Sequence, residues 1–217
     1  AQGGQSALRI GYLRCYTGGE FQRALEAFSL RYPQVSVSVE YGNHEELYDM
    51  LRSGRADLVL NDQRRAFSEE YVNLVLKTCS AFVEVSAHSP LARLARISPQ
   101  ELKETACILV ASPAQRETET EYYRTVVGLS GEFLYAENLE EARMMVSGRK
   151  GFLPVEGSGT APLFSASIAR IPLVRGGTPI RRTYCAFGKK ENRSPAVTAF
   201  ADLLRLQFAD GEGAPRG

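Results

Sequence analysis

ALRIGYLRCYTGGEFQRALEAFSLRYPQVSVSVEYGNHEELYDMLRSGRADLVL, residues 7–60, is the stretch that decides the fold. It holds three segments of strand length, residues 7–13, 35–41 and 56–60. Between them, apolar side chains recur with the spacing of one buried helix face. This alternation of strands and helices predicts a parallel sheet whose crossovers are right-handed. The fold class expected from the stretch is therefore α/β.

Two capping signals indicate where the helices of this stretch begin. Thr17 is followed three residues later by Glu20, which predicts a capping box and a helix that starts near Gly18. Asn43 and Glu46 repeat the pattern and predict the start of a second helix. Each helix would then follow closely on the carboxyl end of a strand.

The rest of the chain is predicted to form a second α/β block that starts near residue 84. Ser98 followed by Pro99 is a helix-start signal. No linker rich in Pro, Gly or Ser separates the two blocks, so we expect strands to join them. Further strands are expected at residues 72–77, 80–86, 107–111, 133–138, 151–155, 170–174 and 181–187, and further helices at residues 98–104, 115–127, 139–147 and 195–208. Met144 and Met145 are expected to pack against the sheet.

Charge and hydropathy exclude several classes of partner. The 217 residues carry a net charge of +1 and have a pI near 7.9. That balance provides no basic surface for nucleic acid or for an acidic membrane. No segment approaches the roughly 18 apolar residues of a membrane span, and the N-terminal AQGGQSA lacks the features of a secretion signal. We expect a fragment of a longer protein, with no membrane partner.

The cysteines do not predict a metal or cofactor site. The four of them are Cys15, Cys79, Cys107 and Cys185. None forms a C-x-x-C pair, and the chain has only His44 and His88 as further zinc ligands. Each cysteine lies in or beside an apolar segment, where a free thiol behaves as a small buried side chain. We expect no metal, no cofactor and a reducing, cytoplasmic environment.

The turn RCYTGGE, residues 14–20, allows three interpretations. It matches neither the phosphate loop nor the dinucleotide fingerprint, and Glu20 would repel a phosphate. A nucleophilic or redox-active Cys15 beside a helix N-terminus is a second interpretation, but catalysis would need a histidine base beside the thiol. The third is that the turn lines a ligand cleft, because ligands of open α/β sheets bind beyond the carboxyl ends of the strands.

Strand ends supply the candidate ligand contacts. The predicted ligand-binding residues are Leu13, Arg14, Cys15, Tyr16, Thr17, Asn61, Asp62, Gln63, Ser112, Gln115, Phe152 and Pro154. The structural alternatives stay open: Thr17 could only cap its own helix, and residues 61–63 could be a solvated loop. Arg64 and Arg65 are expected to be surface charges. We expect no catalytic residues and no metal ligands.

An ordered series of segments resembles the effector-binding domain of LysR-type transcriptional regulators. It runs over roughly residues 7–206 and consists of LRIGYL, FSLRYPQV, EYGNHEELYDMLRSGRADLVL, SAHSPLA, SPQELKE, ENLEEARMMVSGRKGFLPV and SPAVTAFADLLR. The resemblance implies a fold like the type 2 periplasmic binding proteins, in which two Rossmann-like subdomains enclose a ligand cleft. Members of the family often have Ser or Thr in the first strand-end turn, where this chain has Leu13 and Cys15.

The resemblance also implies domain boundaries. Subdomain I would comprise residues 7–84 and 180–209, and subdomain II residues 85–179. The chain would cross between them near residues 82–86 and again near residues 176–183. Residues 1–6 and 210–217 are expected to be disordered tails.

The function implied by the resemblance is effector sensing without catalysis. A small-molecule effector, an anion or a polar metabolite, would bind between the subdomains. DNA would be contacted only through an N-terminal winged helix-turn-helix that this chain lacks, and the domains would form homodimers, with tetramers in the full-length protein. An extracytoplasmic solute-binding protein of a transporter would have the same fold, and an enzyme would need a base near Cys15 or a carboxylate pair in the cleft.

Overall fold

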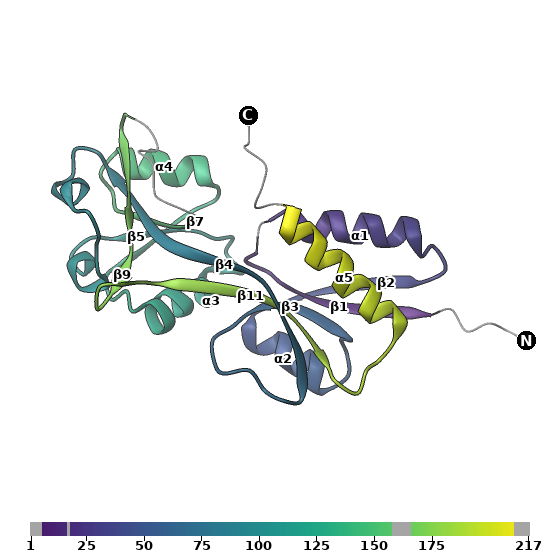
Figure 1. The fold of residues 1–217 in the computed structure, drawn as a ribbon. Helices are drawn as coiled ribbons and strands as arrows, with labels where there is room; N and C mark the ends of the chain where they lie inside the picture. Colours follow the sequence, from purple (N-terminus) through teal and green to yellow (C-terminus); the bar gives the residue numbers. More distant parts are fainter. Residues whose placement is uncertain (1–5, 17, 158–165, 211–217) are drawn as a thin grey trace, which may run out of the picture. The chain divides into compact units, whose positions relative to one another are not determined.

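The computed structural model describes residues 6–16, 18–157 and 166–210, which form two compact units (Figure 1). Unit 1 comprises Ala1–Thr78 and Thr183–Gly217, and unit 2 comprises Cys79–Arg182. The two boundaries between the units lie inside two long strands, β4 (Tyr71–Ser86) and β11 (Arg181–Lys189). The two shorter strands expected at residues 72–77 and 80–86 are therefore one continuous strand.

A mixed sheet with three parallel strands and flanking helices forms unit 1. Its elements are β1 (Ala7–Leu13), α1 (Glu20–Arg31), β2 (Ser36–Gly42), α2 (His44–Arg52), β3 (Leu58–Asp62), the first part of β4, most of β11, and α5 (Pro195–Asp210). The strand order β2–β1–β3–β11 has β1 parallel to both of its neighbours, and β11 antiparallel to β3. The predicted α/β alternation is confirmed.

The two helix starts of unit 1 differ from each other. Asn43 caps α2 as predicted: its side chain accepts the Glu46 N–H at 2.9 Å, and the Glu46 carboxylate accepts the Asn43 N–H at 2.8 Å. The capping box predicted for the first helix is wrong, because α1 begins at Glu20 with Gly19 as its N-cap. The buried Glu20 carboxylate instead accepts the hydroxyl of Tyr16 at 2.8 Å.

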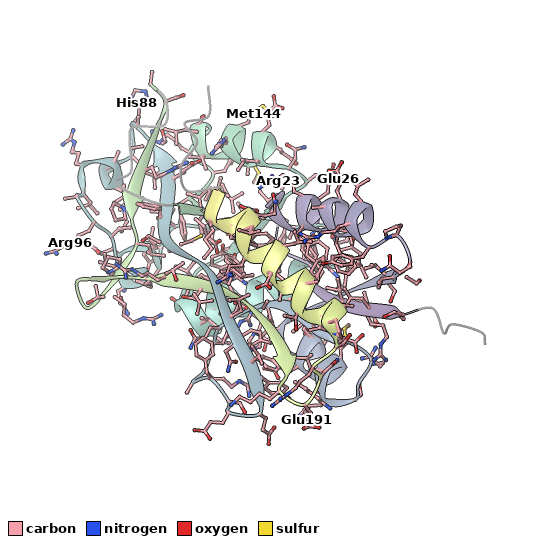
Figure 2. All side chains as sticks on the ribbon, turned by 45° about the vertical axis from the view of Figure 1, so that its right-hand side comes forward. Arg23, Glu26, His88, Arg96, Met144 and Glu191 are labelled. Atoms are coloured by element: carbon pink, nitrogen blue, oxygen red, sulfur yellow. The ribbon has the colours of Figure 1, made fainter. Side chains whose placement is uncertain are left out.

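Aromatic packing between α1 and α5 closes one face of the sheet of unit 1. The ring centroid of Phe200 lies 5.7 Å from that of Phe21 and 5.6 Å from that of Phe28, and all three side chains are buried. The outer side of α1 is polar: Figure 2 shows Glu26 there, whereas the Nε–H of Arg23 donates to the side chain of Gln207 in α5 at 3.0 Å. The helical spacing of the apolar residues thus separates a packed face from a solvated one.

Unit 2 is built around the second part of β4. Its other elements are the 3-10 helices η1 (Pro90–Arg93) and η2 (Pro99–Leu102), the strands β5 (Cys107–Val110), β6 (Phe133–Ala136), β7 (Leu153–Gly157), β8 (Ile168–Pro172), β9 (Val174–Arg175) and β10 (Thr178–Pro179), and the helices α3 (Arg116–Glu121), η3 (Tyr122–Val127) and α4 (Leu139–Ser147). β5 and β6 are parallel, and β7 and β8 each pair antiparallel with β4.

Two helical predictions for unit 2 need correction. The helix expected at residues 115–127 is α-helical only to Glu121 and continues as a π-helical turn that ends at Gly128, where φ is 89°. Met144 does not pack against the sheet; it is 63% exposed and lies on the outer side of α4 (Figure 2). Ala142 and Val146 provide the buried face of that helix. Among the helices of the described residues, none is long and apolar enough to cross a bilayer.

A buried ion triad fastens three elements of unit 2. The carboxylate of Glu84 in β4 is fully buried and accepts hydrogen bonds from Arg143 in α4 at 2.8 and 3.0 Å. It also accepts hydrogen bonds from Arg170 in β8 at 2.7 and 3.3 Å. Burial by itself would raise the pKa of Glu84, but the hydrogen bonds and charges of the two arginines outweigh it and hold the pKa below its ordinary value.

Replacing Glu84 by Gln is expected to lower the free energy of unfolding of unit 2 by about 3 kcal/mol, because two partly buried guanidinium groups would lose the negative charge of Glu84. Urea unfolding measures the loss. The matched control is Glu104→Gln, at a side chain that is 86% exposed and should change stability little.

The same triad predicts a pH dependence of the wild-type protein. Because the folded-state pKa of Glu84 is depressed, its contribution to stability is complete above the ordinary carboxyl pKa, about 4.3, and is lost as the pH falls through the lower folded-state value. Between pH 6 and pH 3 the wild-type protein should lose more stability than Glu84→Gln. Parallel pH profiles of the two proteins would contradict this prediction.

Candidate functional site

The carboxyl ends of three parallel strands meet along one edge of unit 1. Tyr12 in β1 lies opposite Leu60 in β3, and Leu13 lies opposite Gly42 at the end of β2. The turn after β1, the start of α2 and the segment after β3 therefore share this edge. It is the edge at which open α/β sheets bind ligands, and we refer to it as the strand-end edge.

Predicted residues at the end of β1 alternate between interior and surface. Leu13 is buried, whereas Arg14 and Cys15 are partly exposed. The Arg14 N–H donates to the carbonyl of Gly42 at 3.0 Å, and its guanidinium lies 4.0 Å from the carboxylate of Glu46. Arg14 therefore brings positive charge to the strand-end edge, and Cys15 brings a thiol.

Tyr16 turns away from this edge into the core of unit 1. Its hydroxyl donates to Glu20, and its ring centroid lies 4.7 Å from that of Tyr184 and 5.9 Å from that of Phe208. The aromatic ring expected to help line a cleft is thus part of the packing between α5 and the sheet. Thr17, the last residue predicted in this turn, lies outside the described residues.

At the end of β3, Asn61 and Asp62 are buried and are not residues of a solvated loop. The Asn61 side-chain amide donates to the carbonyl of His44 at 3.0 Å, and its oxygen accepts the N–H of Asp62 at 2.9 Å. Gln63 is only partly buried; its N–H donates to the carbonyl of Thr183 at 2.8 Å. Of the three predicted residues, Gln63 reaches furthest toward the surface.

A buried polar network links α2 to the end of β3. The Nδ1 atom of His44 lies 2.9 Å from a carboxylate oxygen of Asp62, and the other oxygen of Asp62 accepts the Nε–H of Arg64 at 3.0 Å. Arg64, expected to be a surface charge, is thus tied to a buried carboxylate. The Nε2 atom of His44 is buried, and no described residue forms a hydrogen bond with it.

His44 belongs to this edge but is not among the ligand-binding residues predicted from the sequence. It directly follows the capping residue Asn43, at the carboxyl end of the second strand. Because the capping box starts α2 directly after β2, the first residue of that helix, His44, lies near the carboxyl ends of β1 and β3. What the sequence did not reveal was that its partner is the carboxylate of Asp62.

In unit 2, the end of β5 exposes two of the predicted residues. The Oε1 atom of Gln115 accepts hydrogen bonds from the N–H of Ser112 at 3.1 Å and from the Ser112 hydroxyl at 2.9 Å. The Gln115 N–H in turn donates to the carbonyl of Ser112 at 2.8 Å. These bonds make a compact turn between β5 and α3, with the Ser112 side chain exposed.

Phe152 and Pro154 do not join Ser112 and Gln115, and the expectation that they form the matching strand end needs correction. β7 begins only at Leu153, and Phe152 bridges to Cys107 at the opposite end of β5 from Ser112. Phe152 is 1% exposed and belongs to the core of unit 2, and the buried Pro154 lies opposite Val83. Both side chains stabilise the interior of the unit.

The described ranges show no metal centre. No group of three His, Cys, Asp or Glu side chains there could hold a metal ion. Since the Nε2 atom of His44 has no described hydrogen-bond partner and its Nδ1 faces Asp62, that histidine makes no hydrogen bond to a described thiol. The arrangement presents a polar, partly positive edge.

Comparisons with known proteins agree with this architecture. A family model described as the LysR substrate binding domain matches residues 1–209. The HTH-type transcriptional regulator CysB of Haemophilus influenzae is 30% identical over 78 residues, which cover 36% of this chain. That match spans only 24% of the length of CysB.

Solved structures with the same fold include two regulatory domains. A double Cys-to-Ser variant of the regulatory domain of MetR, a LysR family regulator from N. meningitidis, has a TM-score of 0.74 at 16% identity, over 94% of this chain and 95% of that one. The BenM effector binding domain with its effector benzoate has a TM-score of 0.63 at 15% identity, over 98% of this chain and 96% of that one. At these identities the likeness concerns the fold.

Cys15 is expected to be the fast-reacting thiol of the native protein. It is partly exposed, whereas the other three cysteines are buried. Burial raises the pKa of Cys107 well above its ordinary value, and burial together with the charge of Asp62 raises the pKa of Cys185 to about 12. Because the thiolate is the reactive form, buried thiols of raised pKa react slowly.

Titration with dithiobis-nitrobenzoate at pH 8 measures this difference. The native wild-type protein should release about one equivalent of dye in the fast phase, with the remainder only after denaturation. Cys15→Ser should abolish the fast phase, and the control Cys79→Ser should retain it. A fast phase that survives Cys15→Ser would disprove the assignment.

Proposed function

The chain belongs to the LysR substrate binding domain family, and on that premise we propose that it senses a small-molecule effector for a transcriptional regulator. The observation that carries the proposal is the strand-end edge of unit 1, where the parallel register brings the turn after β1 beside the segment after β3. The exposed turn of Ser112 and Gln115 is the corresponding feature of unit 2. We propose that the effector contacts the strand-end edge of unit 1 and that the turn of Ser112 and Gln115 in unit 2 offers a further contact for it.

The chemistry of these residues favours an anionic or polar effector. Arg14 supplies a guanidinium that can donate two parallel hydrogen bonds to a carboxylate, and the Ser112 hydroxyl can donate or accept. Gln63 adds an amide at the end of β3. Leu13 and Cys15 stand where relatives often carry hydroxyl groups, so the effector of this chain would rely more on Arg14 than on hydroxyl donors.

The buried members of the predicted set take a supporting role in this proposal. Asn61 and Asp62 hold the segment after β3 against α2 through hydrogen bonds, and Tyr16 anchors the turn after β1 through Glu20. Because these hydrogen bonds hold the backbone in place, the exposed neighbours have little conformational freedom. Less entropy is then lost when they bind a ligand.

Signalling would follow from a shift between arrangements of the two units. β4 and β11 are the strands in which the chain passes from one unit to the other. An effector that binds one arrangement more tightly shifts the population toward it, by no more than its difference in affinity for the two states. No catalytic step is part of this function.

Several further properties follow from the proposal. The regulator would contact DNA through an N-terminal winged helix-turn-helix outside this chain, and it would act in the cytoplasm. Its domains would pair as homodimers, with tetramers in the full-length protein. The net charge of +1 agrees with a domain that leaves DNA contacts to another segment.

Substitutions by large side chains at the two exposed features test the effector site. A thermal-shift screen of small organic acids and amino acids first identifies a stabilising compound; at a concentration of 100 Kd it should stabilise the protein by about 2.7 kcal/mol. Cys15→Phe and Ser112→Tyr should each abolish that stabilisation, because the new rings would fill the space of the effector.

The control for these variants is Ser29→Tyr, an exposed position on α1 that should leave the ligand-induced stabilisation unchanged. Circular dichroism confirms that each variant remains folded. If Cys15→Phe and Ser112→Tyr are both stabilised as strongly as the wild-type protein, the proposed effector site is wrong.

The isolated chain should not bind duplex DNA at physiological salt. Specific DNA binding depends on a set of Lys and Arg contacts to phosphates, and the near-neutral chain offers no excess of positive charge. Fluorescence anisotropy with a labelled duplex measures binding at 150 mM salt. Saturable binding in the nanomolar range would place a DNA-binding surface on this domain and contradict the proposed division of roles.

A further inference from the structure

A pocket lies within unit 1, on the side of α2, and none of the ligand-binding residues predicted from the sequence lines it. Its volume is about 180 Å³. The walls come from α2, from the segment between β3 and β4, and from the start of β4. The lining residues are Glu45, Tyr48, Arg52, Arg65, Ala66, Ser68, Tyr71 and Asn73.

Aromatic rings form the inner part of this pocket. The ring centroids of Tyr48 and Tyr71 are 6.2 Å apart, and Tyr48 also packs 5.6 Å from Phe187 and 5.2 Å from His44. Tyr71 is 8% exposed. Burial raises the pKa of Tyr48 although the charge of Arg65 opposes the shift, so the hydroxyl is protonated at neutral pH and can donate a hydrogen bond.

Two arginines bring positive charge to the mouth of the pocket. The guanidinium carbon of Arg65 lies 5.5 Å from the centroid of the Tyr48 ring, within the range of a cation–π contact. Arg65 pairs with Glu45 at 2.7 Å, and Arg52 pairs with Asp49. The side chains of Arg65 and Glu45 are 62% and 69% exposed, and ion pairs of such exposure contribute at most about 1 kcal/mol. An incoming anion can therefore replace Glu45 at low cost.

Size and chemistry together specify the ligand. A cavity of about 150 Å³ is large enough for benzene, so 180 Å³ accommodates one six-membered ring with a small substituent. The tyrosine rings favour a flat, apolar body, and the guanidinium of Arg65 favours a carboxylate, which it can bind through two parallel hydrogen bonds. We propose that this pocket is a second ligand site, separate from the effector site, which binds a single-ring aromatic carboxylate with its ring beside Tyr48 and its carboxylate on Arg65.

The pocket is connected to the strand-end edge through a short segment of chain. The carbonyl of Arg65 accepts the side-chain N–H of Gln63 at 3.2 Å, and Arg64 between them is bonded to Asp62. A ligand carboxylate that draws the Arg65 side chain away from Glu45 would also shift the position of residues 63–65. Binding itself does not depend on the proposed effector function, because every contact invoked for it lies among the lining residues.

Titrations with four probes test the site on the full chain. Backbone amide shifts of residues 44–52 and 63–73 report binding of benzoate, cyclohexanecarboxylate, benzyl alcohol and inorganic phosphate. Benzoate should bind saturably and at least tenfold more tightly than the other three, which lack either the flat ring or the carboxylate. Equal affinity for benzoate and phosphate, or no saturable shifts in these residues with benzoate, would overturn the proposal.

Variants separate this pocket from the strand-end edge. Arg65→Gln should weaken benzoate binding about tenfold, the loss expected for one charged hydrogen-bond partner. The matched control is Arg55→Gln, since Arg55 pairs with Glu40 at the same 2.7 Å with 53% and 54% exposure but lies outside the pocket. Ala66→Trp, at an exposed position, should block the pocket without removing a charge.

Cys15→Phe should leave benzoate binding at the pocket unchanged, because Cys15 is not a lining residue. If Cys15→Phe abolishes binding while Arg65→Gln and Ala66→Trp do not, benzoate binds at the effector site and the second site does not exist. If Ala66→Trp and Arg65→Gln both retain wild-type affinity, the pocket is not the binding site.

Discussion

The parallel register of β1 with β2 and β3 is the constraint on which the functional part of unit 1 depends. In a parallel sheet every strand must return by a crossover, so all strand ends of one kind fall on the same edge. Residues that are far apart in the sequence, such as Arg14, Asn43 and Gln63, thereby share one boundary of the sheet. The helices that follow the first two strands also begin there, which places backbone N–H groups and polar side chains at the same edge.

Hydrogen bonds between buried polar side chains make this edge rigid. The backbone pairing of the sheet alone would leave these side chains without hydrogen-bond partners. Buried polar side chains stabilise a structure only when they are hydrogen-bonded, and Asn61 and Asp62 satisfy that condition through His44 and Arg64. Nε2 of His44 is the exception within the described residues. A network of this kind fixes the orientation of the segment after β3, because each partner holds the next. The exposed residues at its border are therefore presented by a stiff support.

The order and type of the main elements could be predicted from the sequence, because hydrophobic periodicity and capping residues are local signals. They gave α2 and its capping box, and they gave the strand ends that carry Arg14, Cys15, Gln63 and Ser112. They could not give side-chain direction. Nothing local shows that Tyr16 turns inward to a carboxylate in the next helix, an interaction that accompanies the start of α1 at Glu20.

Tertiary contacts account for the other differences. GFLPV has the composition of a strand, but only the isolated bridge between Cys107 and Phe152 shows that Phe152 lies at the buried end. A similar limit applies to Tyr48 and Arg65, which are 17 residues apart and meet only because the segment after β3 passes over α2. Arg65 looks like an ordinary surface charge in the sequence, and its position over an aromatic ring is a property of the fold.

The segment after β3 is where the two proposed sites influence each other. Its first residue, Gln63, lies at the strand-end edge, and Arg65 belongs to the pocket beside α2. If a ligand at one site changes the affinity of the other, thermodynamic linkage requires the reverse effect to be equal in size. The hydrogen bonds from Gln63 to Arg65 and from Arg64 to Asp62 are short-range connections through which such an effect can pass. Glu45 is the partner that a competing carboxylate can replace at Arg65, since an ion pair of such exposure contributes at most about 1 kcal/mol.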